Sequence, residues 1–146
     1  MRELTRPEID AVLSAEDLGR LGLYDRGADR VYVVPISYVY DDQTLFFHSA
    51  AGLKLDLLKA HPDGICFQVD QIAAIGEWLS VVAWGRFEEI GDQAERQGIL
   101  HSFGDRLFKG PLRDHQNVGR AGQLGAGETV YRIQLTELTG RTDSHT

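Results

Sequence analysis

The 146-residue chain is short of cysteine, of long apolar runs and of positive charge. Its single cysteine, Cys66, excludes a disulfide within the chain and gives no sign of an oxidising compartment. No apolar stretch approaches the roughly 20 residues of a membrane-spanning helix, and the first residues contain no apolar core of a signal peptide. With 15 Lys and Arg against 22 Asp and Glu, the net charge of −7 argues against nucleic acid as the main partner. We expect a soluble, cytoplasmic protein.

Two kinds of functional motif are also missing. No G-x-G-x-x-G fingerprint follows an expected strand, which argues against a Rossmann dinucleotide site. The histidines show no paired spacing of metal ligands, so we expect no metal site; they are His48, His61, His101, His115 and His145. Length and an ordinary hydrophobic content of 42% fit one domain over residues 1–146.

Periodicity and punctuation predict mainly strands, with short helices at the edges. Thr5 and Glu8 form a capping-box pattern for a first helix, and further helices are expected over 53–61 and from Asp92 to about residue 100. The expected strands cover 18–24, 31–40, 44–48, 65–70, 79–90 and 130–138. We expect a hairpin between 31–40 and 44–48 and a loop over 71–78. The Gly-rich segment 104–127 lacks clear periodicity and is expected to be mobile, functional or both.

Hairpins dominate this pattern, and no βαβ alternation is visible. Six antiparallel strands therefore favour a closed or nearly closed barrel of the mainly β class. Pro35 interrupts the strongest strand, so this strand is either a plain edge strand or one along which a ligand lies. Gly85 inside a long strand indicates a bulge or the close approach of another group.

The junction between residues 46 and 55 is the most informative segment. A strand ends at His48-Ser49, and Lys54 falls in the first turn of the next helix, where the helix dipole disfavours a cation. An anion resolves this conflict, because free backbone N–H groups, the Ser49 hydroxyl and the Lys54 ammonium together suit a phosphate. The alternatives are that Lys54 is solvated and that Ser49 caps the helix.

Several segments, in this order and spacing, resemble the pyridoxamine 5'-phosphate oxidase-like FMN-binding split barrel, and within it the nitroimidazole-reductase-like (Nim) group. They are YVVPISY (32–38), LFFHSA (45–50), GLKLDLL (52–58), ICFQVD (65–70), SVVAWGR (80–86) and the ending VYRI…LTGR (130–141). They span most of the chain, and the segment 104–127 matches least. One departure is Leu53, which stands where family members often carry a second basic residue before Lys54.

The resemblance implies a homodimer of six-stranded barrels with FMN in a cleft between the subunits. It implies that the flavin lies along the Pro35 strand, near backbone groups of Val34, Ile36 and Ser37. The residues that it implies beside the cofactor are His48, Ser49 and Ala50, with Lys54 on the phosphate and Trp84 and Gly85 near the cleft.

The resemblance implies an FMN-dependent oxidoreductase that passes electrons from a reduced nicotinamide or similar donor to a small flat acceptor, such as a nitroaromatic. His48 is the candidate proton donor. True pyridoxamine phosphate oxidase activity is not expected, because the determinants for the substrate phosphate are not visible. The alternatives are a non-catalytic flavin- or haem-binding module and a deazaflavin-dependent reductase. His48 and Trp84 also have structural interpretations, as a half-buried histidine and a packing residue.

Overall fold

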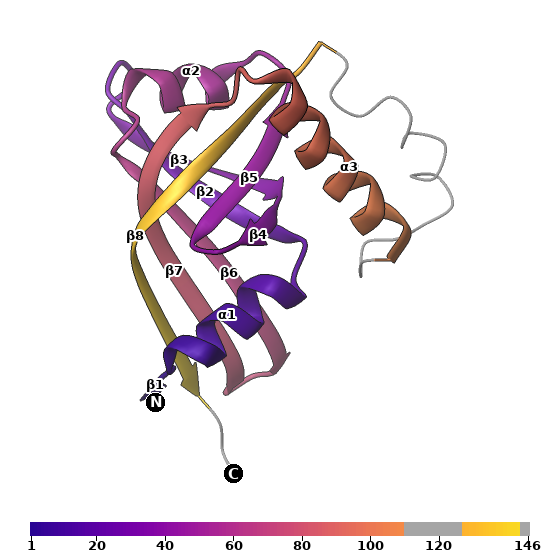
Figure 1. Ribbon diagram of the computed structural model, residues 1–146. Coiled ribbons are helices and arrows are strands. Elements are labelled where there is room, and N and C mark those ends of the chain that lie inside the picture. The colour runs from indigo at the N-terminus through magenta and orange to yellow at the C-terminus, as the bar shows by residue number, and fades with distance from the viewer. Residues whose placement is uncertain (110–126, 144–146) are drawn as a thin grey trace.

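The computed structural model describes residues 1–109 and 127–143, with side chains described for 1–106 and 127–143 (Figure 1). Antiparallel strands form most of the described structure, with three helices around them. In chain order the elements are β1 (Arg2–Glu3), α1 (Arg6–Ala15), β2 (Leu18–Asp25), β3 (Arg30–Ser37), β4 (Val39–Asp41), β5 (Thr44–Ser49), α2 (Leu53–Ala60), β6 (Ile65–Ala74), β7 (Glu77–Glu89), α3 (Gln93–Lys109) and β8 (Thr129–Asp143).

The strands form one antiparallel sheet in the order β3-β2-β6-β7-β8-β5-β4, and β1 pairs with β8. β3 and β4 stand at opposite ends of this order, yet only Tyr38 separates them in the chain, so the sheet curls into a split barrel. The mainly β, antiparallel barrel class is confirmed. The described strands number eight rather than six, because β1 and the short β4 were not expected.

The expected hairpin between 31–40 and 44–48 is wrong for most of its length. β3 pairs with β2, and only the three-residue β4 pairs with β5. The break falls at Tyr38, which is buried, packs edge-on against Phe67 at 5.0 Å and donates a hydrogen bond to the Leu13 carbonyl at 2.7 Å. Pro35 therefore lies in an edge strand, opposite Arg20 of β2.

The expected loop over 71–78 is also wrong. β6 continues to Ala74 and β7 begins at Glu77, so these strands form a long hairpin whose turn contains Gly76 at φ 76°. Most side chains of this extension are exposed, so the sequence lacks the alternation of buried and exposed residues from which a strand is predicted. Along β7 buried and exposed side chains alternate, with Val81 and Ala83 buried and Trp84 and Arg86 exposed.

Two clusters of buried apolar side chains hold the molecule together. The larger fills the barrel between α1 and the strands. The smaller lies outside the barrel, where Ile99 and Phe103 of α3 pack against Ile90 and Val130. Asp92 caps α3 as expected, since its carboxylate accepts from the Glu95 backbone N–H at 2.9 Å. α3 extends to Lys109 instead of ending near residue 100, so residues 104–109 of the Gly-rich segment are helical. Residues 110–126 of that segment lie outside the described part.

None of the helices in the described part of the chain is long and apolar enough to cross a membrane.

Candidate functional site

The N-terminus of α2 is open. β5 ends at Ser49, residues 50–53 are exposed, and Gly52 precedes the helix without any side-chain cap. The first bond of the helix runs from the Asp56 N–H to the Gly52 carbonyl at 3.0 Å. The N–H groups of the first turn therefore have no partner within the helix. A methyl group added at Gly52 would meet no atom within 4 Å, so space remains beside these donors.

Ser49 does not cap α2, which contradicts that interpretation of the sequence. Its side chain points into the barrel, where Oγ lies 2.9 Å from the phenol oxygen of Tyr131. Burial raises the pKa of Tyr131 to about 12, and its hydrogen bond with Ser49 opposes this rise only in part. Ser49 and Tyr131 thus form a neutral buried pair beneath the open helix end.

Lys54 is half-buried in the first turn of α2. Burial lowers the pKa of its ammonium, and the negative charge of Glu128 acts in the opposite direction. A cation that is partly removed from water, at the positive end of a helix, favours an anionic partner. Because α2 begins at Leu53, the structure confirms the expected placement of Lys54 in the first turn of this helix.

His48 lies on the outer face of β5, and its Nδ1 contacts the carboxylate of Glu128, just before β8. The imidazole also packs edge-on against Phe103 of α3, with ring centroids 4.6 Å apart and an interplanar angle of 90°. Because Glu128 also acts on Lys54, it links the two expected site residues His48 and Lys54.

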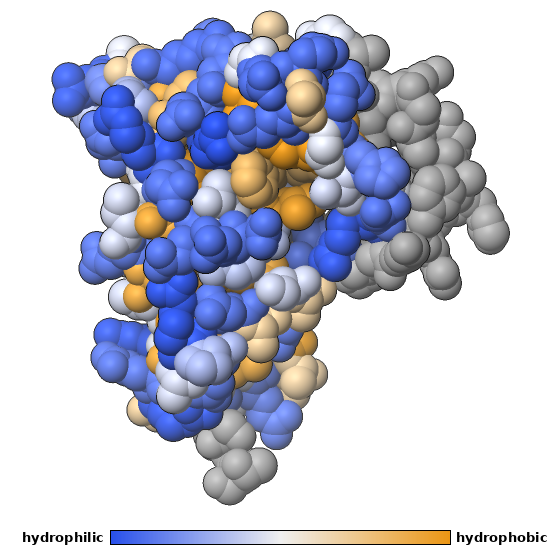
Figure 2. Space-filling view, viewed as in Figure 1, coloured by the Kyte–Doolittle hydropathy of each residue, from blue (hydrophilic) through white to orange (hydrophobic). Residues whose placement is uncertain are grey.

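Sequence reasoning did not find Glu128, Phe103 or Tyr131 as neighbours of this site. Nothing local marks them, because they approach only through the pairing of β5 with β8, in which Ser49 stands opposite Thr129, and through the packing of α3. In the space-filling view, hydrophobic residues gather on the surface beside α3 (Figure 2).

The other expected residues lie elsewhere on the barrel. Val34, Pro35, Ile36 and Ser37 belong to β3, which stands at the opposite end of the strand order from β5 and β4. In the described chain β3 pairs on one side only, with β2, so half of its backbone polar groups remain free for a ligand or another chain.

Trp84 shares an outer sheet face with the β3 strand. One cross-strand row on this face runs from Val33 through Gly22 and Cys66 to Trp84. Val33 is 63% exposed and Trp84 36% exposed. Burial raises the pKa of the Cys66 thiol, which keeps it protonated and unreactive. We call the face formed by this row the outer sheet face.

Gly85 points the other way, into the barrel. The register between β7 and β8 shifts between Trp84 and Gly85, which confirms the expected bulge. A Cβ at position 85 would lie 2.3 Å from the Gln134 carbonyl oxygen and 2.8 Å from Ile133 Cγ2. The close approach at Gly85 therefore comes from β8 of the same chain.

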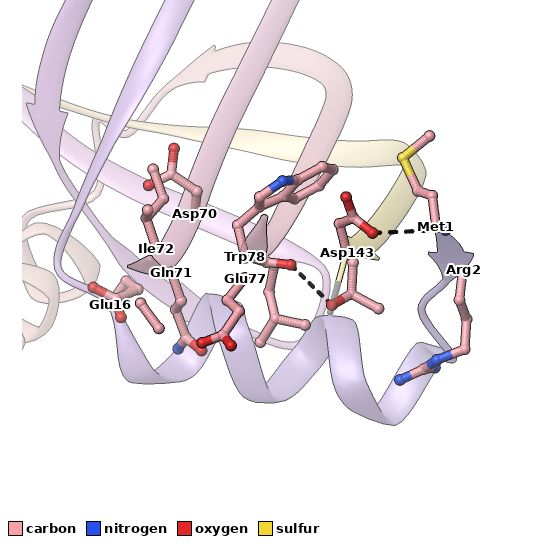
Figure 3. A pocket seen from close by; sticks show the side chains of 12 residues that line it. Met1, Arg2, Glu16, Asp70, Gln71, Ile72, Glu77, Trp78 and Asp143 are labelled. Carbon is pink, nitrogen blue, oxygen red and sulfur yellow. Dashed lines mark hydrogen bonds and ion pairs between the residues drawn. The ribbon is translucent and has the colours of Figure 1, made fainter. Parts of the chain in front are cut away.

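A pocket of about 990 Å³ opens at the far end of the barrel, between the β6–β7 hairpin, α1 and the chain ends (Figure 3). Four carboxylates line it, from Glu16, Asp70, Glu77 and Asp143. None of the expected site residues does so. The surplus of negative charge makes it a poor place for a phosphate.

The chain belongs to the pyridoxamine 5'-phosphate oxidase family, whose model matches residues 5–142. An uncharacterised protein of Rhizobium meliloti is 33% identical over 151 residues, which cover 97% of this chain and 94% of the relative. The expected relationship to this family is thus confirmed.

Solved structures agree with this assignment. An FAD-binding protein from Mesorhizobium loti is 30% identical, with a TM-score of 0.77 and coverage of 98% of both chains. A proposed 5-nitroimidazole antibiotic resistance protein from Bacteroides thetaiotaomicron has a TM-score of 0.72 at 19% identity, covering 95% of this chain and 85% of its own. At that identity the second likeness establishes the shared fold alone.

Proposed function

We propose that this protein is an FMN-dependent oxidoreductase that reduces a small, flat acceptor such as a nitroaromatic, with a reduced nicotinamide or similar compound as electron donor. The observation that carries the proposal is the open N-terminus of α2 with Lys54 in its first turn. The family assignment and the FAD-binding neighbour from Mesorhizobium loti support a flavin as the ligand.

The residues at the start of α2 fit the phosphate of such a cofactor. Uncapped N–H groups and the positive end of the helix dipole favour an anion, and the Lys54 ammonium adds a full charge. The exposed Gly52 leaves room for the ligand to approach the backbone. Ser49 contributes through its fixed position beneath the site, because its hydroxyl is already bonded to Tyr131.

A homodimer is part of the proposal. In the described chain the outer edge of β3 has no strand partner, so its free backbone groups can meet a second copy. The outer sheet face exposes Val31 and Val33 on β3 and Trp84 three strands away on β7, and exposed apolar side chains on one face favour cover by another surface. We propose that a second copy supplies this cover, and that the flavin ring lies between the subunits, along Val34–Ser37 and close to Trp84.

When bound, the flavin supplies the electron-transfer chemistry. The protein would hold the phosphate through Lys54 and the α2 backbone. His48 is proposed as the proton donor to the reduced acceptor, because it is a titratable group in contact with a carboxylate whose charge also acts on Lys54. The single cysteine, Cys66, is compatible with the cytoplasmic location that we propose.

FAD is the second candidate for the cofactor, favoured by the 30% identical neighbour. Extraction of the chromophore from gently purified protein, followed by mass spectrometry, distinguishes FMN from FAD, a deazaflavin or haem. Consumption of reduced nicotinamide with a nitroaromatic acceptor distinguishes an enzyme from a non-catalytic binding module.

The phosphate site is tested by comparing Lys54→Ala with Lys59→Ala, which removes an exposed lysine from the last turn of the same helix. Loss of a charge-assisted hydrogen bond is worth about 1.5–3 kcal/mol, so Lys54→Ala should weaken FMN binding by about ten- to a hundredfold. Riboflavin, which has no phosphate, should bind both variants and the unmodified protein equally. Fluorescence titration measures all of these affinities. Unchanged FMN affinity in Lys54→Ala would place the phosphate elsewhere.

A further inference from the structure

Glu128 stands immediately before the first paired residue of β8, where Thr129 faces Ser49 of β5. Its carboxylate meets Nδ1 of His48, and the two side chains are only 29% and 17% exposed. We infer that Glu128 is a positioning residue for His48. Its carboxylate accepts the Nδ1–H of the imidazole and leaves Nε2 as the nitrogen that exchanges a proton in the site.

Two contacts together determine how the imidazole lies. The carboxylate of Glu128 selects the nitrogen that carries the permanent proton, since an ionised carboxylate only accepts hydrogen bonds. The ring of Phe103, perpendicular to the imidazole at 4.6 Å, restricts rotation about the side-chain bonds. No described residue forms a hydrogen bond with Nε2, so this nitrogen is the one left for a ligand.

The same arrangement defines the proton transfer. In the charged form both ring nitrogens carry protons, and the proton on Nε2 leaves to the acceptor. The neutral imidazole that remains keeps its Nδ1–H on Glu128, so it can be recharged without turning. The nearby carboxylate compensates the positive charge of the ring before transfer, as in a His–carboxylate pair that acts as a general acid.

The pairing also explains why a carboxylate lies close to an expected phosphate site. A lone Glu128 would offset the charge of Lys54 and repel a phosphate. When His48 carries its proton, the charges of His48 and Glu128 cancel, and the charge of Lys54 remains for the anion. Glu128 can therefore serve His48 without removing the attraction of the α2 site for an anion.

The role in proton transfer rests on the proposed function, whereas the orientation of His48 can be measured without cofactor. Glu128→Gln keeps the size of the side chain, but its amide can donate to Nδ1 as well as accept from it, so the Nδ1–H form is no longer enforced. Glu137→Gln, at an exposed position of β8, is the matched control. Glu128→Asp keeps the carboxylate.

The first readout is nitrogen NMR of the histidine rings in cofactor-free protein, with His48 assigned from its loss in His48→Gln. We expect neutral His48 to be protonated on Nδ1 in the unmodified protein, in Glu137→Gln and in Glu128→Asp. In Glu128→Gln a substantial population should move to the form protonated on Nε2. An unchanged ring in Glu128→Gln would overturn the inference.

The second readout is turnover of flavin-loaded protein with a nitroaromatic. Glu128→Gln should lower kcat by about ten- to a hundredfold, while KM for the acceptor changes less than about threefold, and Glu128→Asp should restore part of kcat. A changed tautomer with unchanged kcat would overturn the role in proton transfer. If the protein holds no flavin but the tautomer still depends on Glu128, the proposed function fails and the positioning of His48 stands.

Discussion

Gly85 illustrates how a single residue can serve the fold at a place where the family resemblance implied a cofactor contact. A side chain there would collide with the Gln134 carbonyl oxygen at 2.3 Å, and a backbone atom cannot move aside easily. We therefore expect Gly85→Ala to lower the free energy of unfolding by about 3 kcal/mol, at the upper end of the cost of overpacking. Urea unfolding followed by circular dichroism measures this loss.

Gly98→Ala is the control for the change in Gly85. Gly98 lies inside α3, and a methyl group there meets no atom within 4 Å. Alanine is the better helix former, so this variant should be about 0.5–1 kcal/mol more stable. A Gly85→Ala protein with unchanged stability but weakened flavin binding would instead support a role in the cofactor site.

How much of the site the sequence could predict depends on the range of the interactions. The placement of Lys54 in the first turn of α2 follows from local signals and was predicted correctly. Burial of the Ser49 hydroxyl against Tyr131 and the contact of Glu128 with His48 depend on the register between β5 and β8, about 80 residues apart in the chain. No local pattern encodes that register, so Ser49 was expected as a ligand or cap and Glu128 was missed.

At the scale of elements, α3 is fixed at its far end by an ion pair. Arg106 contacts the carboxylate of Asp17, next to the start of β2, and donates a hydrogen bond to the Glu16 carbonyl at 3.1 Å. Asp17 is buried, and its carboxylate oxygens have no hydrogen-bonding partner among the described residues besides this ion pair. Removal of the guanidinium leaves a buried charge without compensation.

Arg106→Ala should therefore destabilise the protein by about 3 kcal/mol, the lower end for a buried pair that loses one partner, because the arginine is partly exposed. Amide hydrogen exchange in α3 should accelerate as the helix loses its anchor. Arg86→Ala removes an equivalent arginine from the exposed pair with Asp63 at 2.7 Å, and should cost no more than about 1 kcal/mol. Equal effects of the two substitutions would contradict the anchoring of α3.

The starts of helices could be predicted where capping residues mark them in the sequence. The capping box of α1 is present, with the Thr5 N–H donating to the Glu8 carboxylate at 2.9 Å, and Asp92 begins α3 as expected. The end of α3 was missed because its last turns contain Gly104 and depend on contacts such as Arg106 with Asp17. The sequence predicts one strand over 31–40 where the structure has β3 and β4, because the burial of Tyr38 between them depends on tertiary packing.

At the scale of the molecule, the outer sheet face is the surface through which we propose that two copies associate. Val33 stands in the middle of β3, with its side chain in water, in the same row as Trp84. In a twofold symmetric dimer, one substitution on this face changes both sides of the contact. Val33→Asp would then bring two unpaired carboxylates into the interface, while each separate chain keeps its core.

We expect the unmodified protein to sediment as a dimer and Val33→Asp to dissociate, with a Kd at least about thirtyfold higher for a cost of about 2 kcal/mol. Ile75→Asp is the control, since Ile75 is 102% exposed at the tip of the β6–β7 hairpin. It should leave the dimer intact.

Sedimentation velocity over a range of concentrations measures association, and the visible absorbance of the same samples measures retained flavin. Because the proposed flavin site needs both subunits, Val33→Asp should lose flavin as it loses its partner. A Val33→Asp protein that remains dimeric and coloured would show that another surface joins the subunits.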